Sequence, residues 1–96
     1  MILLGDYMEY IREENRVYVK DNEKIVGEVT FPEQNSLLNI NHTYVDPAYR
    51  GMHIADSLLQ HAYEVIQSQE KTCIATCSYA KKWFQNHPEK QNIIKK

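Results

Sequence analysis

One segment of the chain combines residues that suit phosphate binding with the spacing of a loop that opens a helix. It covers residues 45–55 and contains Pro47, Arg50 and Gly51. Pro47 prevents a central strand from continuing. The first amides of the helix that follows have no intrahelical partner, and Arg50 adds a positive charge beside them. This segment predicts a local anion site on the backbone amides of residues 50–55.

Two other residues have side chains suited to nucleophilic and acid–base chemistry. Cys77 is expected where a strand ends and a helix begins, and the helix dipole there favours a thiolate. The alternative for Cys77 is a small buried hydrophobic residue, as most free cysteines are. His42 could act as a base, or it could be a hydrogen-bonded structural histidine. Cys73 lies farther back along the same strand and is expected to be structural.

Three strands are predicted before the loop. Residues 15–20 and 24–31 flank a polar turn, so they are expected to form a hairpin. Alternation in the second of these strands puts Ile25, Gly27, Val29 and Phe31 on one face. Residues 37–45 are predicted as a single third strand that leads into the loop. Residues 1–14 have no clean period, and we expect them to form an edge strand, a helical turn or a mobile tail.

The apolar spacing becomes helical after the loop. From Ile54 onward one face collects the apolar residues Ile54, Ala55, Leu58, Leu59, Ala62, Val65 and Ile66. Residues 72–77 form a short apolar run typical of a buried strand, and Ser78 is expected to cap a second helix that Pro88 ends. A strand–helix–strand unit implies a parallel pair, whose carboxyl ends bring residues 42–45 near residues 76–78.

The predicted fold class is therefore α/β (α+β), an antiparallel meander that leads into a βαβ unit and a C-terminal helix. With 96 residues, of which 43% are hydrophobic, the chain is expected to form one domain over residues 1–96.

Charge and motif content exclude several classes of partner. A net charge of −2 provides no overall positive field for nucleic acid or an anionic membrane. No signal-like or membrane-spanning run is found, and the two cysteines are expected to be reduced, so a cytoplasmic protein is predicted. No metal site is predicted, because the sequence contains no closely spaced pair of metal-ligating residues. We expect a monomer or a weak dimer.

Three segments together resemble a known family. The loop reads Val45-x-Pro47-x-x-Arg50-Gly51-x-x-Ile54-Ala55, and it is similar to motif A of the GNAT superfamily of acetyl-CoA-dependent N-acetyltransferases. The segments His42-Thr43-Tyr44-Val45 and Cys77-Ser78-Tyr79-Ala80-Lys81-Lys82-Trp83-Phe84 resemble hallmarks of very small, single-domain GNAT-like proteins. The resemblance covers about residues 15–88. His53 stands where GNAT enzymes usually have glycine.

The resemblance implies acetyl-CoA, or coenzyme A, as the cofactor. Its pyrophosphate would lie on the amides of residues 50–55, and its pantetheine arm would run beside residues 44–45. Its 3′-phosphate would be within reach of Lys81 and Lys82. The implied coenzyme-binding residues are Tyr44, Val45, Arg50, Gly51, Met52, His53, Ile54, Ala55 and Lys82. Tyr79 would protonate the departing thiolate, or it would pack on Trp83. Cys77 would accept the acetyl group or position the thioester.

The predicted function is acetyl transfer to a primary amine, with a small-molecule acyl donor and an acceptor that the sequence does not identify. The alternative is a non-catalytic module that binds or senses coenzyme A. That alternative is favoured by the absence of segments resembling those with which full-size relatives form the acceptor site.

Overall fold

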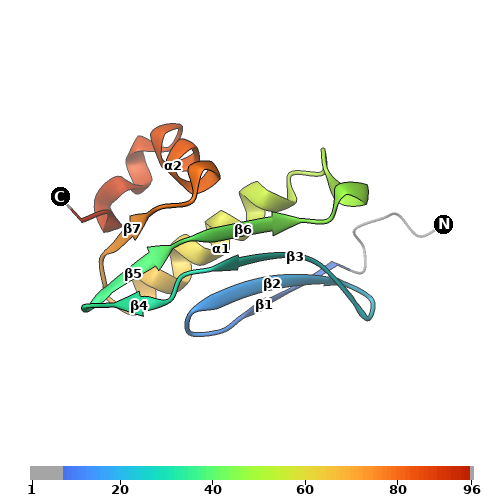
Figure 1. Ribbon diagram of the computed structural model, residues 1–96, viewed down its shortest axis with the longest axis horizontal. Helices are drawn as coiled ribbons and strands as arrows, with labels where there is room; N and C mark the ends of the chain where they lie inside the picture. The colour runs from blue at the N-terminus through green and yellow to red at the C-terminus, as the bar shows by residue number, and fades with distance from the viewer. Residues whose placement is uncertain (1–7, 96) are drawn as a thin grey trace.

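A computed structural model describes residues 8–95 of the chain (Figure 1). The elements, in chain order, are β1 (Met8–Arg12), β2 (Arg16–Asp21), β3 (Lys24–Thr30), β4 (Glu33–Gln34), β5 (Leu37–Ile40), β6 (His42–Val45), the 3₁₀ helix η1 (Pro47–Tyr49), α1 (Ile54–Ser68), β7 (Cys73–Ala75), α2 (Ser78–Gln85) and the 3₁₀ helix η2 (Pro88–Ile93). The mixed α and β class is confirmed. The part of the N-terminal segment before residue 8 lies outside the described residues.

The described strands form two sheets, and the chain passes from one to the other between β5 and β6. One sheet has the order β1-β2-β3-β6 and is antiparallel throughout. The other has the order β4-β5-β7, in which β5 and β7 are parallel. The predicted hairpin and the predicted βαβ unit, β5-α1-β7, are therefore both present. Residues 8–12 form the edge strand of the larger sheet, which was one of the three alternatives for the N-terminal segment.

The prediction of one continuous strand over residues 37–45 is wrong, because the chain changes sheets at Asn41. The Asn41 amide donates to the Thr30 carbonyl at 3.2 Å, and the Thr30 hydroxyl donates to the Asn41 side chain at 2.6 Å. One residue earlier, the Ile40 carbonyl accepts from the amides of both Thr76 and Cys77, each at 3.1 Å. The first half therefore pairs with β7 and the second half pairs with β3.

The predicted inward face of β3 is wrong at one residue. The register between β2 and β3 shifts between Val19 and Lys20, so Val26 is an extra residue in β3. At this bulge two consecutive residues, Val26 and Gly27, face inward, so the side chain before them lies on the opposite face from the one that unbroken alternation predicts. Ile25 is consequently 44% exposed, whereas Val26, Gly27 and Val29 are buried as part of the core.

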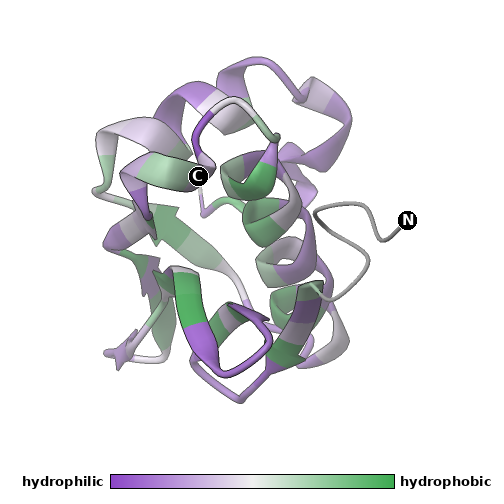
Figure 2. Ribbon diagram, turned by 90° about the vertical axis from the view of Figure 1, so that its right-hand side faces the viewer, coloured by the Kyte–Doolittle hydropathy of each residue, from purple (hydrophilic) through white to green (hydrophobic). Residues whose placement is uncertain are grey.

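Helix α1 covers one face of the larger sheet and provides much of the core. Its buried residues are Ile54, Leu58, Leu59, Ala62, Val65 and Ile66, which confirms the predicted apolar face except at the half-buried Ala55. Hydrophobic residues concentrate between this helix and the strands (Figure 2). Gly27 allows the close approach, because a Cβ there would lie 3.1 Å from Leu58 Cδ1. Helix α1 thereby packs closely on β3.

The start of α2 differs slightly from the prediction. Cys77 occupies the N-cap position with extended backbone angles, and Ser78 is the first helical residue. No side chain caps this helix. Pro88 does follow its end, as predicted, and begins η2.

Candidate functional site

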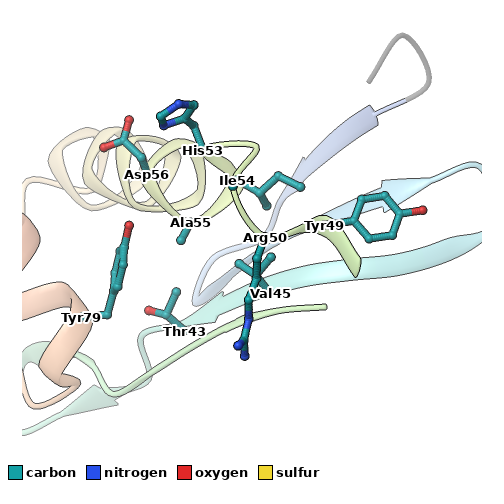
Figure 3. Close-up of a pocket in the computed structure, with 10 residues that line it drawn as sticks. Thr43, Val45, Tyr49, Arg50, His53, Ile54, Ala55, Asp56 and Tyr79 are labelled. Atoms are coloured by element: carbon teal, nitrogen blue, oxygen red, sulfur yellow. The ribbon is translucent and has the colours of Figure 1, made fainter. Parts of the chain in front are cut away.

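A pocket of about 430 Å³ opens where β6, the following loop and the starts of α1 and α2 meet (Figure 3). All four of these segments line it, through Thr43, Val45, Tyr49, Arg50, Gly51, His53, Ile54, Ala55, Asp56 and Tyr79. The break at Asn41 puts β6 in a different sheet from β7, so the two strands are not paired beside the pocket. The pocket coincides with the segment that the sequence singled out.

The loop obtains its shape from local interactions and from two left-handed residues. The Asp46 carboxylate accepts from the Ala48 amide at 2.8 Å and begins η1. Gly51 then has φ +86° and His53 has φ +61°, both in the region that glycine adopts most readily. His53 therefore has the left-handed backbone that favours glycine at this place in related motifs, and it lines the pocket (Figure 3).

The backbone amides of residues 51–56 make the loop a strong candidate for anion binding. Within the described part of the chain, none of these amides donates a hydrogen bond to the backbone or to a side chain, and the first amide that bonds back is Ser57, to the His53 carbonyl at 3.1 Å. Unpaired amides at a helix N-terminus favour a negative ligand, both by hydrogen bonding and through the helix dipole. The exposed Arg50 side chain extends past Val45 along the same pocket (Figure 3).

Tyr79 and Asp56 face each other across the pocket. The Tyr79 hydroxyl points toward Asp56 (Figure 3). Burial raises the pKa of Tyr79, and the negative charge of Asp56 raises it further, so the hydroxyl remains protonated at neutral pH. Asp56 also accepts from the indole Nε1 of Trp83 at 2.6 Å, which links α1 to α2. The Tyr79 hydroxyl therefore has a proton that it can donate into the pocket.

The two cysteines have opposite electrostatic environments. Burial raises the pKa of the Cys77 thiol, but the amides of Ala80 and Tyr79 and the Thr43 hydroxyl more than offset it, so the net shift is downward. Cys77 Sγ lies 3.6 Å from the Oγ1 of Thr43, a pocket residue. Cys73 is fully buried, and burial raises its pKa to about 12. The Cys77 thiol, beside the pocket, therefore loses its proton more readily than an ordinary cysteine, whereas the buried Cys73 thiol holds its proton more tightly.

The structure does not bring every predicted residue into the pocket. Side chains alternate along β6, so Thr43 and Val45 face the pocket while His42 and Tyr44 lie on the opposite face of the sheet. His42 Nε2 lies 3.7 Å from the Glu28 carboxylate on that outer face. We therefore assign His42 no role in the pocket.

The remaining predicted residues separate into two groups. Arg50, Gly51, His53, Ile54 and Ala55 line the pocket. Met52 packs against the hydrophobic core instead, and Lys82 lines a second, adjacent pocket. Sequence reasoning missed Thr43 and Asp56. The alternation of β6 could have identified Thr43, because it shares a face with Val45.

Metal and membrane features are absent from the described region. No group of three or more His, Cys, Asp or Glu side chains among residues 8–95 could hold a metal ion. No helix in the same range is long and apolar enough to span a membrane.

Fold and site together define a class of protein. A free helix N-terminus that follows the carboxyl end of a strand is typical of an α/β domain that binds a phosphate-containing ligand. A family model described as GCN5-related N-acetyl-transferase matches residues 15–93. The chain therefore belongs to the GCN5-related N-acetyltransferase family, which confirms the predicted family and the acetyltransferase class of enzyme.

Solved structures support the same assignment. The chain is similar to a GCN5-like candidate N-acetyltransferase from Staphylococcus aureus, with 26% identity and a TM-score of 0.72, over 94% of this chain and 90% of that one. It also shares its fold with the ribosomal-protein-S18-alanine N-acetyltransferase of Escherichia coli, with 14% identity and a TM-score of 0.63, over 86% of this chain and 53% of that one. A comparison with curated proteins gave no match.

Proposed function

We propose that this chain binds acetyl-CoA and transfers its acetyl group to a primary amine. The observation that carries the proposal is the run of unpaired amides at residues 51–56 on the wall of a pocket of about 430 Å³. Backbone amides at a helix start are well suited to a pyrophosphate, and Arg50 adds a charge that can pair with it.

The edge of β6 is suited to the pantetheine arm. β6 pairs with β3 along one edge, and its other edge has no strand partner among the described residues. Hydrogen-bonded and non-bonded pairs alternate along an antiparallel ladder, and the bond from the Asp46 amide to the Val26 carbonyl makes Val45 a residue whose backbone groups point to this free edge. They can therefore bond the amides of an extended ligand, as an added strand would. In this proposal Val45 contributes through its backbone, whereas the backbone groups of Tyr44 face β3.

Acetyl-CoA supplies an acetyl group as a reactive thioester. The chain contributes positioning, through the amides of residues 51–56 and the edge of β6, and a proton, through Tyr79. As the amine nitrogen bonds to the carbonyl carbon, the carbon–sulfur bond breaks and the sulfur takes the Tyr79 proton. The attacking nitrogen then gives its extra proton to the Tyr79 phenolate, which leaves a neutral amide and restores the tyrosine. Transfer through Cys77 is the competing route, in which its sulfur carries the acetyl group before the amine does.

Titration with acetyl-CoA, followed by amide NMR, tests the binding site. The largest shifts are expected at residues 51–56 and at Tyr44 and Val45. Shifts confined to residues 8–31 would contradict the assignment. Arg50→Ala should weaken binding by about 1–3 kcal/mol, the range for a charge-assisted hydrogen bond. Arg16→Ala is the matched control, because Arg16 pairs with Glu28 at 2.5 Å on the outer face of the sheet.

A panel of primary amines, with release of free coenzyme A as the signal, tests turnover. The proposal expects acetylated amine, and tight binding without any turnover would instead support a non-catalytic coenzyme-binding module. Intact mass after incubation with acetyl-CoA distinguishes the two routes. An acetyl group mapped to Cys77, together with loss of turnover in Cys77→Ser, supports the Cys77 route. If no acetyl adduct forms and Cys77→Ser turns over at the parent rate, direct attack by the amine is the route that remains.

A further inference from the structure

The edge strand β1 is attached to helix α1 by a small cluster of polar side chains. One side of β1 pairs with β2, and its other side has no strand partner among the described residues. Tyr10 and Arg12 lie opposite buried valines of β2, so both side chains face α1. There they contact His61 and Glu64, which are neighbours on the helix surface. We call Tyr10, Arg12, His61 and Glu64 the β1 latch.

The geometry of the β1 latch requires a neutral His61. The Arg12 Nε donates to His61 Nδ1 at 3.0 Å. Because an arginine side chain has donors only, Nδ1 must accept, and the proton of the neutral ring lies on Nε2. The Tyr10 ring stacks on the imidazole with centroids 4.6 Å apart and an angle of 16° between the planes. A proton on Nδ1 would place two donors against each other and a second positive charge beside Arg12.

The charged groups around His61 act on it in opposite directions. Burial and the positive charge of Arg12 lower the pKa of His61, whereas the Glu64 carboxylate raises it, and the net result lies below the ordinary value of 6.5. Tyr10, Arg12 and Glu64 are the titratable or charged groups that face His61 within the described part of the chain. Glu64 pairs with Arg12 through one oxygen and accepts from Gln60 at 2.7 Å through the other. A protonated His61 would therefore have to compete for a carboxylate whose oxygens both have partners.

We propose that the β1 latch is a pH-sensitive switch, which holds the edge strand on α1 while His61 is neutral and loosens it when His61 is protonated. Since the docked strand favours the neutral ring, the latch contributes fully above about pH 6.5 and loses this contribution as the pH falls below that value. Arg12 keeps its pair with Glu64, so β1 loosens without losing every contact to the helix. The switch does not depend on the proposed function, because no residue of the latch lines either pocket.

Amide hydrogen exchange at about pH 7.5 and pH 5.0 tests the proposal. Protection factors remove the pH dependence of the intrinsic exchange rate, and the amides of β3 are the internal reference. The protection of β1 relative to β3 should fall about two- to ten-fold at the lower pH, the range for one lost hydrogen bond. His61→Gln should remove this fall, because an amide oxygen can accept from Arg12 but does not titrate. His42→Gln is the matched control and should keep it, since His42 lies on the outer face of β6.

Titration of the His61 imidazole by NMR provides an independent readout. Its midpoint should lie below 6.5 in the parent and should rise in Arg12→Met, which removes the neighbouring positive charge. Arg12→Met also removes the hydrogen bond at both pH values, so its β1 should have low protection that no longer depends on pH. A parent midpoint of 6.5 or above would overturn the proposal. Relative protection of β1 that is the same at both pH values in the parent, or that falls equally in His61→Gln, would overturn it as well.

Discussion

The two cysteines provide an internal pair for a test of the site electrostatics. Both are free thiols. Burial raises the pKa of Cys73 to about 12. The pKa of Cys77 lies below its ordinary value of 9.0, because the amides of Ala80 and Tyr79 and the Thr43 hydroxyl outweigh the opposing effect of burial. Alkylation with iodoacetamide at pH 8 should therefore label Cys77 first.

The expected ratio of rates follows from the thiolate fractions. At pH 8 about 0.01% of Cys73 is thiolate, whereas Cys77 has more than about 9%, which gives a ratio of roughly a thousand. A thiolate of lower pKa is a weaker nucleophile, and a Brønsted coefficient of about 0.5 reduces the advantage to roughly 30-fold. The complete burial of Cys73 then protects it further.

The assay is pulsed alkylation, quenched in acid and mapped by peptide mass. The labelling rate of Cys77 should rise with pH and level off with a midpoint below 9.0, because only the thiolate reacts. Urea-unfolded protein is the control, in which both cysteines should react at similar rates. Labelling of Cys73 in the folded protein as fast as Cys77, or a Cys77 midpoint of 9.0 or above, would refute the reasoning.

Three further predictions concern stability. Gly27→Ala should lower the free energy of unfolding in urea by about 1–3 kcal/mol, since its Cβ would lie 3.1 Å from Leu58 Cδ1; an unchanged midpoint would contradict this. His53→Val should cost about 1–2 kcal/mol by thermal unfolding, because a β-branched residue must then adopt φ +61°, whereas His53→Gly should not. The raised pKa of Cys73 stabilises the fold fully below pH 9, and this contribution is lost as pH rises toward 12. Urea unfolding at pH 10 should therefore show a loss of about 1 kcal/mol relative to pH 8 that Cys73→Ala lacks.

Local sequence patterns predicted where helices and strands lie better than they predicted which strands pair with each other. The start of α1 at Ile54 was correct, because the helical apolar spacing begins there and the loop before it blocks a strand. The break at Asn41 was missed, because strand-forming residues continue on both sides of it. It arises from distant groups, namely Thr30, which bonds Asn41, and the amides of Thr76 and Cys77, which share the Ile40 carbonyl.

The site was predictable where it is contiguous in sequence. Arg50, Gly51 and His53 line the pocket because a single loop carries them, and no long-range information is needed to bring them together. Alternation along β6 would also have predicted which of its side chains face the pocket. Since Val45 and Thr43 share the pocket face, His42 must lie on the other face. The bulge at Val26 could not be predicted from the sequence of β3 alone, because it depends on the register with β2.

The candidate phosphate loop is held from outside as well as by its own sequence. Tyr49 donates to the Asp21 carboxylate at 2.6 Å, and Lys24 pairs with Asp46 at 3.1 Å. Both partners flank the turn between β2 and β3, so the hairpin restrains the loop while α1 restrains its other end. The ion pair is exposed and contributes little, but the tyrosine bond to a charged group is stronger. A loop restrained at both ends loses less conformational freedom on binding, so more of its interaction with an anion remains as affinity. The hairpin thereby acts on the site without lining it.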